Sequence, residues 1–201
     1  MKKIKNPNHP KKGSTIRVDP IKYKKDIKSI KVLLANKPMD LALFTIGINT
    51  NLRASDILQI KVKQVKNLKP MDEIIISKEK KTGKRRKINL NKACIDAIGG
   101  WLVSDAGKKL RDSDFLFTGK RGTVIGVPAV NLKVKRWCAA VRLKGNYGSH
   151  TLRKTFGYHK RLAGVNIPTL MVCFNHSNQK QTLDYLCIQP DEIKNVYEGI
   201  I

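Results

Sequence analysis

Hydrophobic residues recur at helical spacing along most of the chain. In residues 26–36, for example, apolar side chains stand at positions 27, 30, 32, 33 and 34. Apolar positions three and four residues apart form one continuous stripe on an α-helix. This pattern predicts helices over 26–36 and 39–48, a short helical segment over 54–59, and further helices over 91–103, 127–142, 150–163, 166–173, 178–187 and 190–199.

Two other stretches alternate between apolar and polar residues. Ile60, Val62 and Val65 are interspersed with lysine and glutamine, which predicts a half-buried strand. Residues 73–77 and 86–90 flank a polar turn centred on Lys81-Thr-Gly-Lys84, which is the pattern of a β-hairpin. Because the chain shows neither a repeat nor an interdomain linker, we expect one mostly α domain with a small antiparallel β-sheet (α+β).

The net charge narrows the class of partner. Lys and Arg number 41 against 15 Asp and Glu, which gives a formal net charge of +26 in 201 residues. Such an excess favours a polyanionic partner that binds less tightly as salt rises, although ribosomal-type and anionic-membrane proteins share it. No apolar run has membrane-spanning length, so we expect no membrane segment.

Domain organisation and compartment follow from the N-terminus and the cysteines. Residues 1–18 are rich in Lys, Pro, Asn and Gly and lack periodicity. They predict a flexible basic arm, which either lies along DNA or is a solvated tail, ahead of one domain over 19–201. The cysteines include no Cys-x-x-Cys pair, which argues against a zinc ribbon or a disulfide framework and favours reduced thiols in the cytoplasm: Cys94, Cys138, Cys173 and Cys187. No metal or cofactor is expected.

The C-terminal half carries side chains suited to work on a phosphate diester. His150 and Arg153 stand three residues apart on a predicted helix, and His176 and Tyr185 follow. Arginine can clamp the anion, histidine can donate or accept a proton, and tyrosine can attack phosphorus. In a chain this basic, we expect the phosphate to belong to a nucleic acid.

Two further candidates lie upstream. Arg53 stands where a polar break enters a predicted helix, and Lys81 lies at the tip of the predicted hairpin. Taken singly, every candidate has an ordinary explanation. Arg53 then pairs with Asp56 at the surface, the lysine is solvated, the histidines are surface or loop residues, and the tyrosine packs against its neighbours.

The order of these residues changes the interpretation. An arginine, a hairpin lysine, a His-x-x-Arg pair, a histidine and then a tyrosine resemble the tyrosine recombinase (phage integrase) family, from Pro20 to Ile188. Residues 43–58 (LFTIGINTNLRASDIL) are similar to the family's first arginine box, residues from 78 onwards to its hairpin-lysine region, and residues 149–156 (SHTLRKTF) to its second box. Two departures are a Phe174-Asn175-His176 sequence in place of the common Leu-Gly-His, and the expected absence of the usual N-terminal core-binding domain.

The resemblance implies the tyrosine recombinase catalytic-domain fold and DNA strand transfer without metal or ATP. It makes Tyr185 the nucleophile that forms a 3′-phosphotyrosyl intermediate, while the two arginines hold the non-bridging oxygens. Lys81 is the expected general acid, and Asp56 is expected to brace Arg53. His150 is expected to assist proton transfer at the tyrosine hydroxyl and His176 to donate to the phosphate, and the reverse division between the two histidines stays open.

An assembly and a location are implied as well. In the family, four protomers on two sites in double-stranded DNA form the working unit, and a DNA-bending accessory protein is a further expected partner. Residues 191–201 (DEIKNVYEGII) form either an exchanged docking helix or a helix packed on its own core. We expect a cytoplasmic, nucleoid-associated protein. Two other activities stay open: DNA relaxation by a type IB topoisomerase, and DNA binding without catalysis on the same fold.

Overall fold

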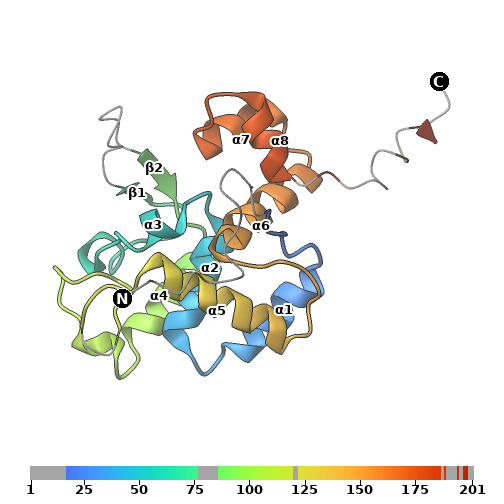
Figure 1. Ribbon diagram of the computed structural model, residues 1–201. Coiled ribbons are helices and arrows are strands. Elements are labelled where there is room, and N and C mark those ends of the chain that lie inside the picture. The colour runs from blue at the N-terminus through green and yellow to red at the C-terminus, as the bar shows by residue number, and fades with distance from the viewer. Residues whose placement is uncertain are drawn as a thin grey trace, which may run out of the picture.

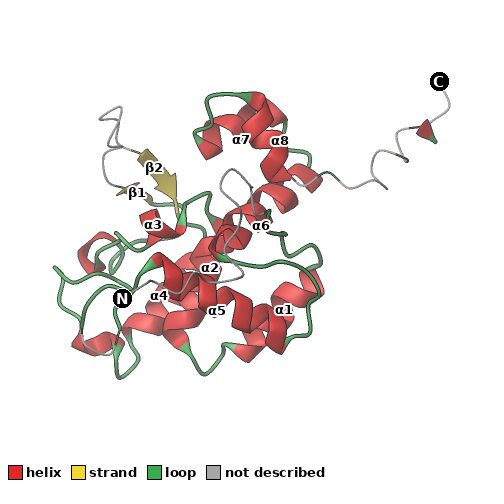
Figure 2. Ribbon diagram, viewed as in Figure 1, coloured by secondary structure: helices red, strands yellow, loops and turns green. Residues whose placement is uncertain are grey.

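The computed structural model describes residues 17–76, 86–119 and 122–186, together with positions 188, 194, 197 and 198. These residues are mostly helical and include a two-stranded antiparallel sheet (Figures 1 and 2), as predicted. The elements are α1 (Lys24–Leu33), α2 (Pro38–Asn49), α3 (Ala54–Ile57), η1 (Val62–Gln64), β1 (Glu73–Ile76), β2 (Arg86–Asn89), α4 (Lys92–Leu102), η2 (Gly107–Lys109), α5 (Val127–Ala140), α6 (Ser149–Leu162), α7 (Ile167–Phe174) and α8 (Gln179–Leu186).

The predicted helices up to α8 are confirmed to within three residues at each end. Local sequence explains several of these boundaries. Helix α2 begins at Pro38, whose missing N–H costs nothing at the first helical position. The side chains of Asn91 and Asn166 cap α4 and α7 by accepting hydrogen bonds from backbone N–H groups of the first turn. The predicted helix over 190–199 lies largely outside the described residues.

Helix α2 runs through the centre of the molecule and is buried on all sides. Residues 42–47 are all buried, and the helix packs against α4 and α6. Gly47 permits the contact with α6, because a Cβ atom there would lie 2.5 Å from Leu152 Cδ1. This close approach brings the end of α2, and the turn that follows it, next to the start of α6.

The predicted hairpin is confirmed, but the strand predicted over 60–65 is wrong. Strands β1 and β2 pair from Glu73 opposite Asn89 to Ile76 opposite Arg86. Residues 62–64 instead form the 3₁₀ helix η1, and Val62 and Val65 are both buried. Residues three apart would face opposite sides of a strand, whereas in a 3₁₀ helix they lie on one side. Burial of both valines therefore selects the helical turn.

Helix α6 connects the main core with a smaller one near the C-terminus. Helices α7 and α8 pack against α6 and stand apart from the other helices (Figure 1). The smaller core is formed by Leu170, Phe174 and Leu186. Gly157 of α6 admits the ring of Phe174, because a Cβ atom there would lie 2.6 Å from the ring carbon Cζ. The junction between the two cores is where α6 passes the end of α2.

The segment before α1 is attached to helix α6. The backbone N–H of Ile21 donates to Thr155 Oγ1 at 2.9 Å, and His159 Nε2 lies 2.9 Å from the Ile21 carbonyl oxygen. Asn146 Nδ2 donates to the carbonyl oxygen of Arg17 at 2.8 Å. Of the arm predicted over residues 1–18, residues 1–16 lie outside the described part of the chain.

Candidate active site

Arg53 lies in the turn between α2 and α3, with an exposed side chain. It is the N-cap residue of α3, and Asp56 Oδ2 accepts a hydrogen bond from its backbone N–H at 3.1 Å. A carboxylate three residues into a helix commonly satisfies the N-cap N–H in this way. Asp56, the residue expected to brace Arg53, therefore contacts it at the backbone N–H group.

Arg153 of α6 is almost completely buried, at 1% exposure. Its Nη1 donates to the carbonyl oxygen of Asn51, and its Nη2 donates to the carbonyl oxygen of Phe174 at 2.6 Å. His176 Nε2 lies 3.5 Å from the same Nη2 atom. One guanidinium thus joins the turn after α2 to the end of α7, and both segments carry predicted site residues.

A small pocket opens beside these two arginines. It has a volume of about 80 Å³ and is lined by Arg53, Ala54, Ser55, Val127, Ser149, His150 and Arg153. Two guanidinium groups and the N-terminal turn of α6 contribute to its walls. Guanidinium donors and the partial positive charge of a helix N-terminus both favour an anion. The pocket is therefore suited to an anionic group such as a phosphate.

The histidine of this pocket contacts the predicted nucleophile. His150 Nδ1 and the Tyr185 hydroxyl oxygen are 2.9 Å apart. Burial lowers the pKa of His150 from its usual 6.5, and the positive charges of Arg153, Arg53 and Lys154 lower it further. A neutral imidazole can accept the tyrosine proton through this nitrogen. Of the two candidate histidines, His150 is therefore the one that lies at the tyrosine hydroxyl.

His176 is held from both sides. Its Nδ1 lies 3.0 Å from Thr182 Oγ1 of α8, and its ring stacks on Phe174 with the ring centroids 5.1 Å apart. Asn175, in the position where the resembling family commonly has glycine, adopts the left-handed conformation at φ 51° and ends α7. Asparagine tolerates this conformation better than most residues with a side chain. The turn that carries His176 is therefore formed without the glycine.

Among the described residues, no group of His, Cys, Asp and Glu side chains is arranged to hold a metal ion. Burial raises the pKa of Cys94 and of Cys138 to about 12, so both thiols stay protonated. No described helix is both long and apolar enough to cross a membrane.

Comparison with known proteins decides the family. The sequence matches the Phage integrase family over residues 13–192. The chain belongs to the phage integrase family. It is 33% identical over 182 residues to a probable integrase/recombinase, YoeC of Bacillus subtilis (strain 168), and the match covers 90% of this chain and 96% of YoeC. It is also 31% identical over 160 residues to the tyrosine recombinase XerC of Caldanaerobacter subterraneus subsp. tengcongensis, covering 79% of this chain and 44% of XerC.

A solved structure confirms the expected fold. The structure of the XerH site-specific recombinase, bound to a palindromic difH substrate in a post-cleavage complex, is similar with a TM-score of 0.72 and 17% sequence identity. The match covers 90% of this chain and 53% of XerH. The phage integrase chain described here thus spans nearly all of YoeC, but only about half of XerC and XerH.

The structure brings together five of the six residues that the sequence singled out for chemistry. Arg53, His150 and Arg153 share the small pocket, Tyr185 contacts one of them, and His176 contacts another. Lys81 lies outside the described residues. Sequence reasoning missed the residues that connect this group, among them Asn51, Thr182 and Lys154. A signal existed only for Lys154, which follows the arginine of the second box and stands four residues after its histidine.

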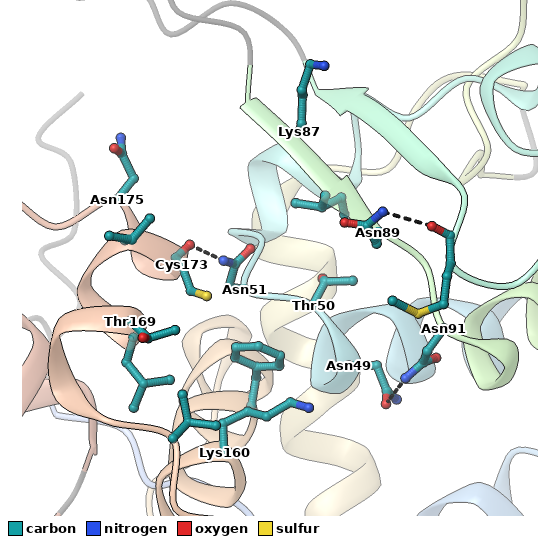
Figure 3. Close-up of a pocket in the computed structure, with 16 residues that line it drawn as sticks. Asn49, Thr50, Asn51, Lys87, Asn89, Asn91, Lys160, Thr169, Cys173 and Asn175 are labelled. Atoms are coloured by element: carbon teal, nitrogen blue, oxygen red, sulfur yellow. Dashed lines mark hydrogen bonds between the residues drawn. The ribbon is translucent and has the colours of Figure 1, made fainter.

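A larger pocket lies on the other side of Asn51 and contains none of the predicted catalytic residues. It has a volume of about 660 Å³ between the end of α2, β2, α6 and α7 (Figure 3). Asparagine side chains line much of it, and one of them, Asn51, donates from Nδ2 to the carbonyl oxygen of Cys173. The backbone carbonyl of Asn51 accepts from Arg153, so this residue forms a wall between pocket and site.

Proposed function

We propose that this member of the phage integrase family is a site-specific DNA recombinase that cleaves and rejoins strands through a 3′-phosphotyrosyl intermediate. The observation that carries the proposal is the 2.9 Å contact between Tyr185 and His150, at the edge of a small pocket with two arginines. The names of YoeC, XerC and XerH, an integrase/recombinase, a tyrosine recombinase and a site-specific recombinase, support the same activity.

In the proposed cleavage step, Tyr185 Oη attacks the scissile phosphorus while its proton passes to His150 Nδ1. A bond forms between the phenolic oxygen and phosphorus, and the bond from phosphorus to the 5′-oxygen breaks. The leaving 5′-oxygen takes a proton, and Lys81 is the proposed donor. The new ester conserves the bond energy, so a 5′-hydroxyl can reverse the step without ATP.

The arginines and the second histidine stabilise the charge that develops on phosphorus. Arg53 and Arg153 border the small pocket and would bind the non-bridging oxygens placed there. His176, 3.5 Å from the second guanidinium, is proposed to donate to the phosphate. This division of work leaves His150 for the tyrosine proton. Asp56 supports the first arginine through its backbone N–H.

Double-stranded DNA is the proposed partner, in agreement with the net charge of +26. We further propose four protomers on two paired sites, a DNA-bending accessory protein and a nucleoid location. Measurement of particle mass with and without DNA tests the assembly. A particle that remains monomeric in both conditions would contradict it.

Covalent capture on DNA tests the activity. The protein is mixed with nicked fragments of the genome that encodes it, the mixture is denatured, and the protein-linked DNA is sequenced. Tyr185→Phe is the control, because it keeps the ring and removes the nucleophilic oxygen. We expect wild-type adducts at one short inverted-repeat site and none from the variant. Adducts scattered over many sequences would indicate a topoisomerase-like activity, and an adduct that survives in Tyr185→Phe would refute the nucleophile.

A further inference from the structure

Helix α6 directs three polar side chains towards Tyr185. His150 contacts the hydroxyl group, and the Arg153 Cζ and Lys154 Nζ atoms each lie 5.6 Å from the centre of the tyrosine ring. Lys154 is only 6% exposed. Because His150 and Lys154 are four residues apart, they occupy one face of the helix, one turn from each other. The lysine is thus a buried cation beside the proposed nucleophile and its proton acceptor.

We propose that Lys154 is a positioning residue for strand cleavage, which holds the Tyr185 ring against α6 and keeps His150 in the unprotonated form that accepts the tyrosine proton. This inference rests on the proposed function. It adds a role for a lysine that the mechanism above does not use, and that does not line the small pocket.

The physical basis is the charge of the ammonium group in a mostly buried place. A cation over an aromatic ring is attracted by the negative face of the ring, more strongly when water is excluded. The same charge disfavours a second positive charge on the imidazole one turn away. Once the proton has moved, the phenolate oxygen is negative, and its attraction to the ammonium offsets the repulsion between the ammonium and the imidazolium.

The charged and titratable groups around His150 come from several elements. Arg53 approaches from the turn after α2, Arg153 and Lys154 lie on α6 itself, and Tyr185 lies on α8. Burial and the three cations all lower the pKa of His150, with Lys154 as the smallest of the three charge effects. Because removal of the lysine leaves the other two cations in place, we expect a partial but measurable change in the pKa of His150.

The test compares Lys154→Met, which keeps the aliphatic stem without the charge, with Lys154→Arg, which keeps the charge. Lys25→Met is the matched control, because Lys25 Nζ also lies 5.6 Å from a tyrosine ring, that of Tyr23, and both residues are exposed at the start of α1. Histidine-labelled protein is titrated by NMR without DNA, and His150→Gln assigns the His150 signal. Thermal unfolding confirms that each variant folds, and Lys154→Gln replaces the methionine variant if that one does not.

We expect Lys154→Met to raise the His150 titration midpoint by about half a pH unit, the effect at the dielectric constant of water of a unit charge roughly 6 Å away, which is the spacing of side chains four residues apart on a helix. Lys154→Arg and Lys25→Met should stay near wild type. On the DNA site recovered by covalent capture, the methionine variant should form adduct up to about 3-fold more slowly on the acid limb, and that limb should move to higher pH.

Two results would overturn the inference about the lysine while leaving the recombinase intact. One is an unchanged His150 midpoint in Lys154→Met, with cleavage slowed equally at every pH, which indicates a structural lysine only. The other is Lys154→Arg behaving like Lys154→Met. Absence of any wild-type adduct would instead overturn the proposed function, and with it the role of Lys154 in cleavage.

Discussion

The two arginines of the site are expected to differ sharply in their effect on stability. Arg153 is 1% exposed and donates to two backbone carbonyl groups, those of Asn51 and Phe174. Arg53 is exposed at the surface of a turn. Both are proposed to bind the same phosphate, so both alanine variants should lose adduct formation by about 100-fold to 1000-fold. Only Arg153→Ala should also unfold more easily than the wild type.

The magnitude follows from the two carbonyl groups. A hydrogen bond to a charged donor contributes about 1.5–3 kcal/mol, and its loss here leaves buried acceptors without that donor. Arg153→Ala should therefore lower the free energy of unfolding by about 3–6 kcal/mol, a large part of the 5–15 kcal/mol typical of a domain. Arg153→Lys should lie between, because an ammonium cannot reach both carbonyls with the geometry of a guanidinium. Arg53→Ala should stay within about 0.5 kcal/mol of wild type.

Urea unfolding followed by circular dichroism measures these differences, and covalent adduct formation is assayed on the same preparations. Arg136→Ala is the matched control for loss of an exposed arginine, since Arg136 lies on the exposed face of α5. If Arg153→Ala unfolds within about 0.5 kcal/mol of wild type, or if Arg53→Ala is destabilised equally, the guanidinium does not join the two segments as described.

Three other predictions concern protonation and backbone geometry. Because the pKa of His150 is lowered, the folded protein binds this proton less readily than the unfolded chain, and its stability should fall as pH drops below 6.5. The acid limb of the cleavage rate should also lie below pH 6.5, and His150→Gln should abolish that limb in a pH–rate profile. Asn175→Gly should keep adduct formation and stability, whereas Asn175→Ala should cost about 1 kcal/mol in urea unfolding, because alanine resists the left-handed conformation; equal stability of the two would contradict this. Gly157→Ala should cost about 1–3 kcal/mol and slow cleavage by displacing Phe174, whereas Gly99→Ala, with nothing within 4 Å, should not destabilise the protein.

Much of the fold was predictable from local pattern. Apolar residues at helical spacing located the helices up to α8, and isoleucine-rich segments around a polar turn located the hairpin. The error over residues 60–65 arose because spaced valines and lysines suit a strand and a 3₁₀ turn equally well. Only the surrounding core showed that Val62 and Val65 face the same side.

The sequence by itself determined which residues are candidates, because their order along the chain survives any folding: Arg53, Lys81, His150, Arg153, His176 and Tyr185. It could not determine which of them touch. The contacts between His150 and Tyr185, and between Arg153 and the ends of α2 and α7, join positions 21 to 102 residues apart. Whether residues so far apart in the sequence meet depends on how closely the helices approach each other, and here one glycine of α2 and one of α6 permit that approach. Tertiary packing therefore decided that one histidine contacts the tyrosine hydroxyl, that one arginine is buried, and that Lys154 stands beside the proposed nucleophile.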